Sequence, residues 1–184
     1  MGQRAEPIIA AYIGHTAAAR ALDGHIHLPL NGRLVNGRLA HSKDDREAEP
    51  KRLASQPAVF LDRDGVLVKE IGHISNPRDL CLLPGVPEAL KALHSRFYLI
   101  IITNQSGIAR GFFTEDDLLE IHTHLVKILS NHGVAVDAIH YCPHHPEANI
   151  QQYKQICDCR KPGSGMLRHA ERNWRLDLPR SFMV

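Results

Sequence analysis

Two aspartates separated by one residue are the first candidates for chemistry. Asp62 and Asp64 stand just before Gly65 and directly after the apolar run 58–61. If that run is a buried strand, both carboxylates lie at the strand end, where open α/β sheets bind their ligands. Gly65 permits a sharp turn there, and a carboxylate with a nearby backbone carbonyl can hold a small hard cation. Asp64 then remains free for proton transfer, although the same run also suits a solvated turn.

Two more polar runs follow at comparable places. The run 103–107, Thr-Asn-Gln-Ser-Gly, comes after the apolar stretch 98–103, and its N–H groups with the Thr103 hydroxyl suit phosphate oxygens. Arg160 and Lys161 precede a predicted helix and offer a guanidinium and an ammonium group to phosphate. Alone, the first run also fits a capping turn and the second a surface pair. Together with the aspartates, they predict a phosphate site at one edge of a sheet.

A cluster of cysteines and histidines gives the strongest local signal. The pattern is C-x-H, twelve residues, then C-x-C, and its members are Cys142, His144, Cys157 and Cys159. Three thiolates and one imidazole complete a tetrahedral shell for Zn²⁺ and leave no position for water, so a structural zinc is predicted. Without a metal, residues 142–160 would form a long loop with no core of its own. His145 is the alternative to His144.

From residue 57 onward, short apolar runs alternate with helical periodicity, which is typical of parallel β/α units and predicts the α/β class. The expected strands are 58–61, 98–103, 136–141 and 181–184, and the expected helices are 87–94, 114 to about 132, and 162–174. Residues 1–56 differ, with an alanine-rich stretch and a charged run at 42–52. They have too little apolar surface for a core, and we interpret them as an N-terminal extension or linker preceding a domain at 57–184.

The overall composition excludes several classes of partner. Lys and Arg number 22 against 20 Asp and Glu, for a net charge of +2, so no global field favours nucleic acid or an anionic membrane. No apolar run approaches the ~18 residues that a transmembrane helix needs, and the first twenty residues lack the order of a signal peptide. We therefore expect a cytoplasmic protein, and a monomer, without nucleic-acid or membrane partners.

With these motifs in order, residues 57–184 resemble the haloacid dehalogenase superfamily, and within it the zinc-bearing D-glycero-D-manno-heptose 1,7-bisphosphate phosphatases. The matching runs are 60–65, 103–111 with 114–115, 141–146 and 157–162. The resemblance implies a Rossmann-like three-layer domain with a minimal cap and a zinc-binding loop. Histidinol-phosphate phosphatase domains share the aspartates and the zinc loop, and they are the alternative within the same superfamily. Residues 1–56 are outside the resemblance.

Carried over residue by residue, the resemblance implies a catalytic group of five. Asp62 would be the nucleophile and a ligand of Mg²⁺, and Asp64 the general acid/base, with its backbone carbonyl on the same ion. Thr103 and Asn104 would hold the transferring phosphoryl group, and Lys161 would neutralise it.

A second group would bind the sugar substrate: Glu70, Gly72, His73, Gln105, Ser106, Arg110 and Arg160. Relatives commonly have tyrosine where His73 stands, so the sugar preference is open.

The implied activity is hydrolysis of a small sugar bisphosphate in the synthesis of a lipopolysaccharide precursor. A further carboxylate for magnesium comes, in this superfamily, from a Gly-Asp after the fourth strand. Residues 181–184 resemble the strand that leads into it, so the chain is expected to be C-terminally incomplete, to bind magnesium weakly and to turn over poorly. A non-catalytic zinc-stabilised module is therefore the rival from another class.

Overall fold

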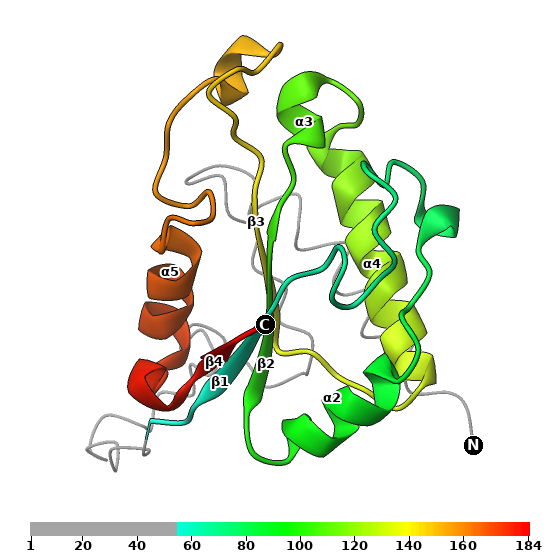
Figure 1. Cartoon of the computed structure of the whole chain (residues 1–184), viewed down its shortest axis with the longest axis vertical. Coiled ribbons are helices and arrows are strands. Elements are labelled where there is room, and N and C mark those ends of the chain that lie inside the picture. The colour runs from blue at the N-terminus through cyan, green and yellow to red at the C-terminus, as the bar shows by residue number, and fades with distance from the viewer. Residues whose placement is uncertain (1–54) are drawn as a thin grey trace, which may run out of the picture.

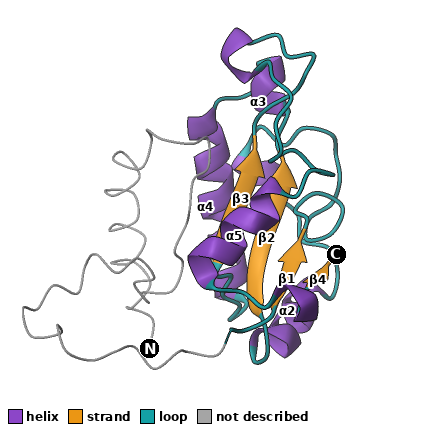
Figure 2. Cartoon of the chain, turned by 90° about the vertical axis from the view of Figure 1, so that its left-hand side faces the viewer, coloured by secondary structure: helices purple, strands orange, loops and turns teal. Residues whose placement is uncertain are grey.

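The computed structural model describes residues 55–184, so all but the last two residues of the predicted N-terminal extension lie outside it. Its centre is a four-stranded sheet in the order β3-β2-β1-β4, and every pairing is parallel. The strands are β1 (Ala58–Leu61), β2 (Tyr98–Asn104), β3 (Ala138–Cys142) and β4 (Phe182–Met183). The arrowheads of β1, β2 and β3 point toward the end of the molecule where α3 lies (Figure 2).

Helices cover both faces of the sheet and make three layers. Helices α2 (Val86–His94) and α4 (Glu115–Asn131) lie on one face, and α5 (Gly165–Trp174) lies on the other (Figure 1). The short α3 (Gly107–Arg110) follows β2 directly. Three 3₁₀ turns complete the order: η1 (Pro77–Asp79), η2 (Gln151–Tyr153) and η3 (Leu178–Arg180). The predicted three-layer α/β class is confirmed. Within residues 55–184, no helix combines the length and apolar character that crossing a membrane requires.

The central strands read as unbroken apolar runs because both of their faces are covered. In β1, Val59 and Leu61 join the core under α2 and α4, while Ala58 and Phe60 join the core under α5. All four side chains are buried. This two-residue alternation fixes which face each residue takes, and it leaves the next residue, Asp62, at the carboxyl end of the strand.

Helix α4 is defined by its first turn and by its apolar side. The Thr114 hydroxyl accepts a hydrogen bond from the backbone N–H of Asp117 at 3.1 Å, and the Asp117 carboxylate accepts one from Thr114 N at 2.7 Å. The hydrogen bonds that Thr114 N and Thr114 Oγ1 donate to the Asp117 carboxylate lower the pKa of Asp117. The helix buries side chains three or four residues apart: Leu118, Ile121, Leu125 and Leu129. The predicted start, Thr114, is therefore the N-cap of α4, whose first helical residue is Glu115, and the helix packs on the sheet by one side.

One helix begins later than predicted. We expected a helix from residue 162, but α5 begins at Gly165. Gly163 N donates to the Arg160 carbonyl at 2.7 Å and Gly165 N donates to the Asp158 carbonyl at 2.8 Å, so residues 158–164 form tight turns instead. The Lys161–Pro162 peptide within this segment is cis. Lys161 is consequently held in a turn ahead of the helix.

Replacing Thr114 tests the N-terminal cap of α4. Thr114→Ala removes one side of the reciprocal pair, and we expect it to lower the free energy of unfolding by about 1 kcal/mol in urea denaturation. Ser130→Ala, at an exposed position near the other end of the same helix, is the control and should stay within about 0.5 kcal/mol of wild type. Equal stability of the Thr114→Ala variant and wild type would show that the cap contributes nothing.

Candidate active site and metal centre

An ion pair marks the carboxyl ends of β1 and β2. The Lys161 ammonium contacts Asp62 Oδ2 and also donates to the Ile102 carbonyl at 3.2 Å. Asp62 Oδ1 accepts a hydrogen bond from Arg63 N at 2.8 Å. The Asp62 side chain is 32% exposed and that of Lys161 is 19% exposed, so both remain accessible from solvent. The structure thus brings together a carboxylate and a cation that the sequence placed on separate motifs.

Asn104 holds the backbone of Lys161 in place. Its side-chain oxygen accepts a hydrogen bond from Lys161 N at 3.0 Å, and its amide nitrogen donates to the Lys161 carbonyl at 3.2 Å. Both polar atoms of the Asn104 side chain are therefore engaged by the turn that carries Lys161. The contact with a phosphoryl group that the sequence suggested for Asn104 stays a prediction.

The second aspartate lies deeper and is surrounded by donors. Asp64, 15% exposed, accepts two hydrogen bonds from Arg63, from Nε to Oδ1 at 3.0 Å and from Nη2 to Oδ2 at 2.8 Å. Gln105 Nε2 donates to Asp64 Oδ2 at 2.9 Å and to Thr103 Oγ1 at 2.8 Å. Because Thr103 Oγ1 accepts this bond, its hydroxyl hydrogen can still be donated to a phosphate oxygen. Gln105 faces inward, so its predicted contact with substrate stays a prediction.

Oxygen atoms suited to a hard cation occur at the same place. Asp62 offers a carboxylate, and no donor among residues 55–184 reaches the backbone carbonyl of Asp64. Carboxylate and carbonyl oxygens are the ligands that Mg²⁺ prefers, usually with several waters retained. The residues present therefore fit magnesium.

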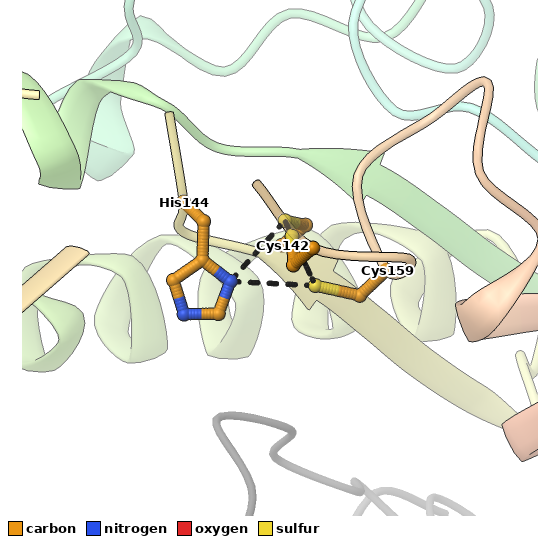
Figure 3. Close-up of side chains that lie close together, drawn as sticks. Cys142, His144 and Cys159 are labelled. Carbon is orange, nitrogen blue, oxygen red and sulfur yellow. Dashed lines mark hydrogen bonds between the residues drawn. The ribbon is translucent and has the colours of Figure 1, made fainter. Parts of the chain in front are cut away.

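The predicted zinc ligands meet in one cluster, although they come from the end of β3 and from the loop after it. Their four ligand atoms all lie within 4.8 Å of one another. The Cys159 sulfur is 3.0 Å from that of Cys157. It also lies 3.1 Å from the Cys142 sulfur and 3.4 Å from His144 Nδ1 (Figure 3). Three sulfurs and one nitrogen gathered in one place are the ligand set of a closed tetrahedral zinc site.

The thiols and the neighbouring histidine support this assignment. Burial is the first cause that raises the pKa of Cys157, and the contact with Cys142, followed by burial, raises that of Cys159. A bound cation would replace the protons that these thiols otherwise keep. His145 stands outside the cluster because its Nδ1 accepts a hydrogen bond from Glu147 N at 3.1 Å. The structure therefore places His144, rather than His145, among the candidate ligands.

Two tyrosines tie the zinc-binding loop to the start of α4. Tyr141 and Tyr153 donate to the two carboxylate oxygens of Glu115, at 2.5 Å and 2.7 Å. Burial, and then the Glu115 carboxylate, raise the pKa of Tyr153 to about 12, so it remains a donor. No role was predicted for these tyrosines, because nothing in the local sequence pattern shows that one carboxylate binds both.

The residues expected to contact the sugar lie in three segments of the chain: the loop after β1 (Glu70, Gly72 and His73), the end of β2 with α3 (Gln105, Ser106 and Arg110), and the turn before α5 (Arg160). Glu70 accepts a hydrogen bond from Gly72 N at 2.6 Å, which closes a small turn. The ring centroid of the next residue, His73, lies 4.9 Å from the ring centroid of Phe112, and Phe112 is 57% exposed. Nothing in the local sequence pattern indicated this contact between His73 and Phe112.

Basic side chains gather beside the zinc-binding loop. Arg160 Nη1 donates to the His144 carbonyl at 3.3 Å, and Asn149 donates to the Arg110 carbonyl at 3.1 Å. Burial and then the positive charges of Arg160 and Arg110 lower the pKa of His145. Ser106, also expected to contact substrate, is the N-cap of α3, and its carbonyl accepts a bond from Arg110 N at 3.0 Å. Both of the predicted substrate-binding arginines therefore act electrostatically on His145.

Two solved structures share the fold of this chain. A putative HAD-like phosphatase from Mesorhizobium loti superposes with a TM-score of 0.67 at 33% identity, over 70% of this chain and 62% of that one. The D,D-heptose 1.7-bisphosphate phosphatase from B. bronchiseptica, complexed with magnesium and phosphate, gives a TM-score of 0.57 at 35% identity, over 66% of this chain and 65% of that one. The fold and the site together define a haloacid dehalogenase-like phosphatase, that is, a phosphoric monoester hydrolase.

Curated relatives narrow the class further. The D-glycero-beta-D-manno-heptose-1,7-bisphosphate 7-phosphatase of Photorhabdus laumondii is 46% identical over 129 residues, which cover 70% of this chain and 69% of that protein. The enzyme of the same name from Escherichia coli K12 is 40% identical over 131 residues, covering 71% and 69%. The family model described as polynucleotide kinase 3 phosphatase matches residues 58–182. The chain belongs to the family of D-glycero-beta-D-manno-heptose-1,7-bisphosphate 7-phosphatases, and it spans less than two thirds of the two solved structures.

The metal cluster can be tested with a pair of cysteine variants. Cys157→Ser removes one of four proposed ligands, and we expect purified protein to lose most of its zinc and to melt at a lower temperature, because a structural metal contributes directly to folding. Cys81→Ser is the control, since Cys81 is exposed and outside the cluster. Elemental analysis and thermal melts provide the measurements. Wild-type protein purified without chelator that contains no zinc would contradict the assignment.

Proposed function

We propose that this chain hydrolyses D-glycero-D-manno-heptose 1,7-bisphosphate, with Asp62 as the nucleophile. The observation that carries the proposal is the contact between the Asp62 carboxylate and the Lys161 ammonium at the ends of β1 and β2, with Asp64 two residues away. The names of the relatives support the substrate, a small phosphorylated sugar on the route to heptose-containing polysaccharide. We assign the activity to residues 57–184 and regard residues 1–56 as an extension.

The first chemical step transfers the phosphoryl group to the protein. One carboxylate oxygen of Asp62 attacks phosphorus, a P–O bond to Asp62 forms, and the P–O bond to the sugar breaks. Asp64 gives its proton to the leaving sugar oxygen. The Lys161 ammonium and the Thr103 hydroxyl would stabilise negative charge on the phosphoryl oxygens, and Asn104 holds the backbone of Lys161.

The second step releases phosphate and restores the protein. Water attacks the phosphorus of the aspartyl phosphate and gives a proton to Asp64, and the P–O bond to Asp62 breaks. Asp64 is then protonated and ready for the next substrate. The two aspartates thus have separate roles, which agrees with their settings: the side chain of Asp62 is more exposed than that of Asp64.

Two metal ions would support this chemistry in different ways. The Asp62 carboxylate and the Asp64 carbonyl would hold Mg²⁺, which supplies positive charge to the phosphoryl oxygens when bound. A magnesium complex of the B. bronchiseptica relative supports this choice of ion. Cys142, Cys157, Cys159 and His144 would hold Zn²⁺, whose four protein ligands leave no room for catalytic water. Arg160 and Lys161 follow the last of these cysteines directly, so the zinc site would position them.

Loss of the nucleophile should abolish turnover without unfolding the protein. Asp62→Asn keeps the shape of the side chain but removes the attacking oxygen, and we expect the rate to fall by at least ~10³-fold. Asp79→Asn, at an exposed position in η1, is the control and should keep the wild-type rate. Phosphate release from heptose bisphosphate, with histidinol phosphate in parallel, provides the assay. More than about a tenth of the wild-type rate in Asp62→Asn would exclude Asp62 as nucleophile.

Magnesium dependence can be separated from zinc dependence. Brief EDTA treatment should lower phosphate release at least tenfold, because the ion held by exposed oxygens exchanges more readily than one enclosed by thiolates. Adding MgCl₂ should restore the rate and adding ZnCl₂ should not, with the zinc content measured in every sample. Full activity in protein shown to be free of magnesium would rule out this part of the proposal.

A further inference from the structure

The arginine between the two aspartates is one of the most deeply buried side chains of residues 55–184. Arg63 is 1% exposed, although a guanidinium cannot lose its charge in a protein. Burial of such a group is costly unless its N–H groups find partners. A charged residue adjacent to both proposed reacting groups, turned away from solvent, therefore needs an explanation that the mechanism above does not give.

The partners of Arg63 come from three separate elements. Its Nε and Nη2 form a fork on the two oxygens of Asp64, at 3.0 Å and 2.8 Å. Nη2 also donates to Gln105 Oε1 at 3.0 Å, beyond the end of β2. Nη1 lies 3.5 Å from His122 Nε2 on α4. Both terminal nitrogens of the guanidinium thus contact a protein atom. These contacts hold the guanidinium in the orientation that places Nε and Nη2 on the two oxygens of Asp64.

Two neighbours keep the fork in this orientation. Burial and the charge of Arg63 lower the pKa of His122 well below its usual value, so the ring is neutral and Nε2 can accept from the guanidinium. Gln105 contacts both members of the pair, accepting from Arg63 and donating to Asp64 Oδ2 at 2.9 Å. Arg63, Asp64 and Gln105 therefore form a closed ring of hydrogen bonds.

We propose that Arg63 is a positioning residue that fixes the Asp64 carboxylate for proton transfer, with Gln105 and His122 holding the guanidinium. The inference rests on the proposed function of Asp64. Oδ2 accepts from Arg63 and from Gln105, whereas Oδ1 accepts only from Arg63 Nε among the described residues. Oδ1 is thus the oxygen with a lone pair left for the proton. Arg63 acts through Asp64 and needs no contact with substrate.

The first experiment compares Arg63→Lys, Asp64→Asn and the double variant in the full chain. Lysine keeps the charge but loses the fork, and a misplaced proton donor should lower kcat on heptose bisphosphate ~10²-fold. KM should change less than about threefold, because substrate binding is untouched. The double variant should be no slower than Asp64→Asn, since Arg63 acts only through that carboxylate. Arg96→Lys, at an exposed site, is the matched control and should keep the wild-type rate.

A substrate with a good leaving group gives a sharper signature. Nitrophenolate leaves p-nitrophenyl phosphate without a proton, so Arg63→Lys should still form the aspartyl phosphate but hydrolyse it slowly. We expect a burst of about one nitrophenolate per protein molecule, followed by slow turnover, in both Arg63→Lys and Asp64→Asn. A wild-type kcat in Arg63→Lys would overturn the inference. A double variant whose fold loss in kcat equals the product of the two single losses would also overturn it. So would an equal loss on both substrates with no burst.

A measurement without substrate covers the case in which a variant unfolds or the wild type is inactive. In ¹⁵N NMR of the wild-type chain, the Arg63 Nε–H should exchange with water much more slowly than that of exposed Arg96, and its signal should shift in Gln105→Ala. Exchange as fast as that of Arg96 would overturn the inference by itself. A wild-type chain that hydrolyses neither substrate would refute the proposed function instead, and the exchange rate would still decide whether Arg63 holds Asp64.

Discussion

The contact between Asp62 and Lys161 is the interaction on which the site depends, since it joins the first strand to the turn before the last helix. An ammonium and a carboxylate that are both partly withdrawn from water gain little unless a rigid frame sets their geometry. The parallel pairing of β1 with β2 provides one side of that frame. Asn104, at the end of β2, provides the other by binding the backbone N–H and carbonyl of Lys161.

The turn that carries Lys161 is itself held by the loop that bears the cysteine and histidine cluster. Cys159 lies in the candidate metal cluster, and the backbone then turns so tightly that a Cβ on Gly163 would lie 2.3 Å from the Asp158 carbonyl oxygen. No side chain fits there, so glycine is required. The bonds from Tyr141 and Tyr153 to Glu115 anchor the other parts of the loop. A segment with little apolar surface thus becomes part of the site through a metal cluster, close backbone contacts and one shared carboxylate.

Much of the fold could be predicted because it follows from local patterns. The unbroken apolar runs of β1 and β2 indicated buried parallel strands, and a threonine followed by three acidic residues, 114–117, indicated where α4 begins. The start of α5 at Gly165 was not predicted, although a proline at position 162 favours the first turn of a helix. Packing of the preceding turn against the Asp158 carbonyl overrode that preference.

The sequence by itself determined the chemical groups of the site and the sheet edge at which they meet. Asp62 and Asp64 follow a strand, and parallel strands bring their carboxyl ends to one edge whatever the loops between them do. Only the tertiary structure decided the direction of the side chains: Arg63 is buried against α4, Gln105 turns inward, and Asn104 binds the backbone of Lys161. These choices depend on partners more than forty residues apart in the chain, and a local pattern carries no information about which buried donor will meet which acceptor.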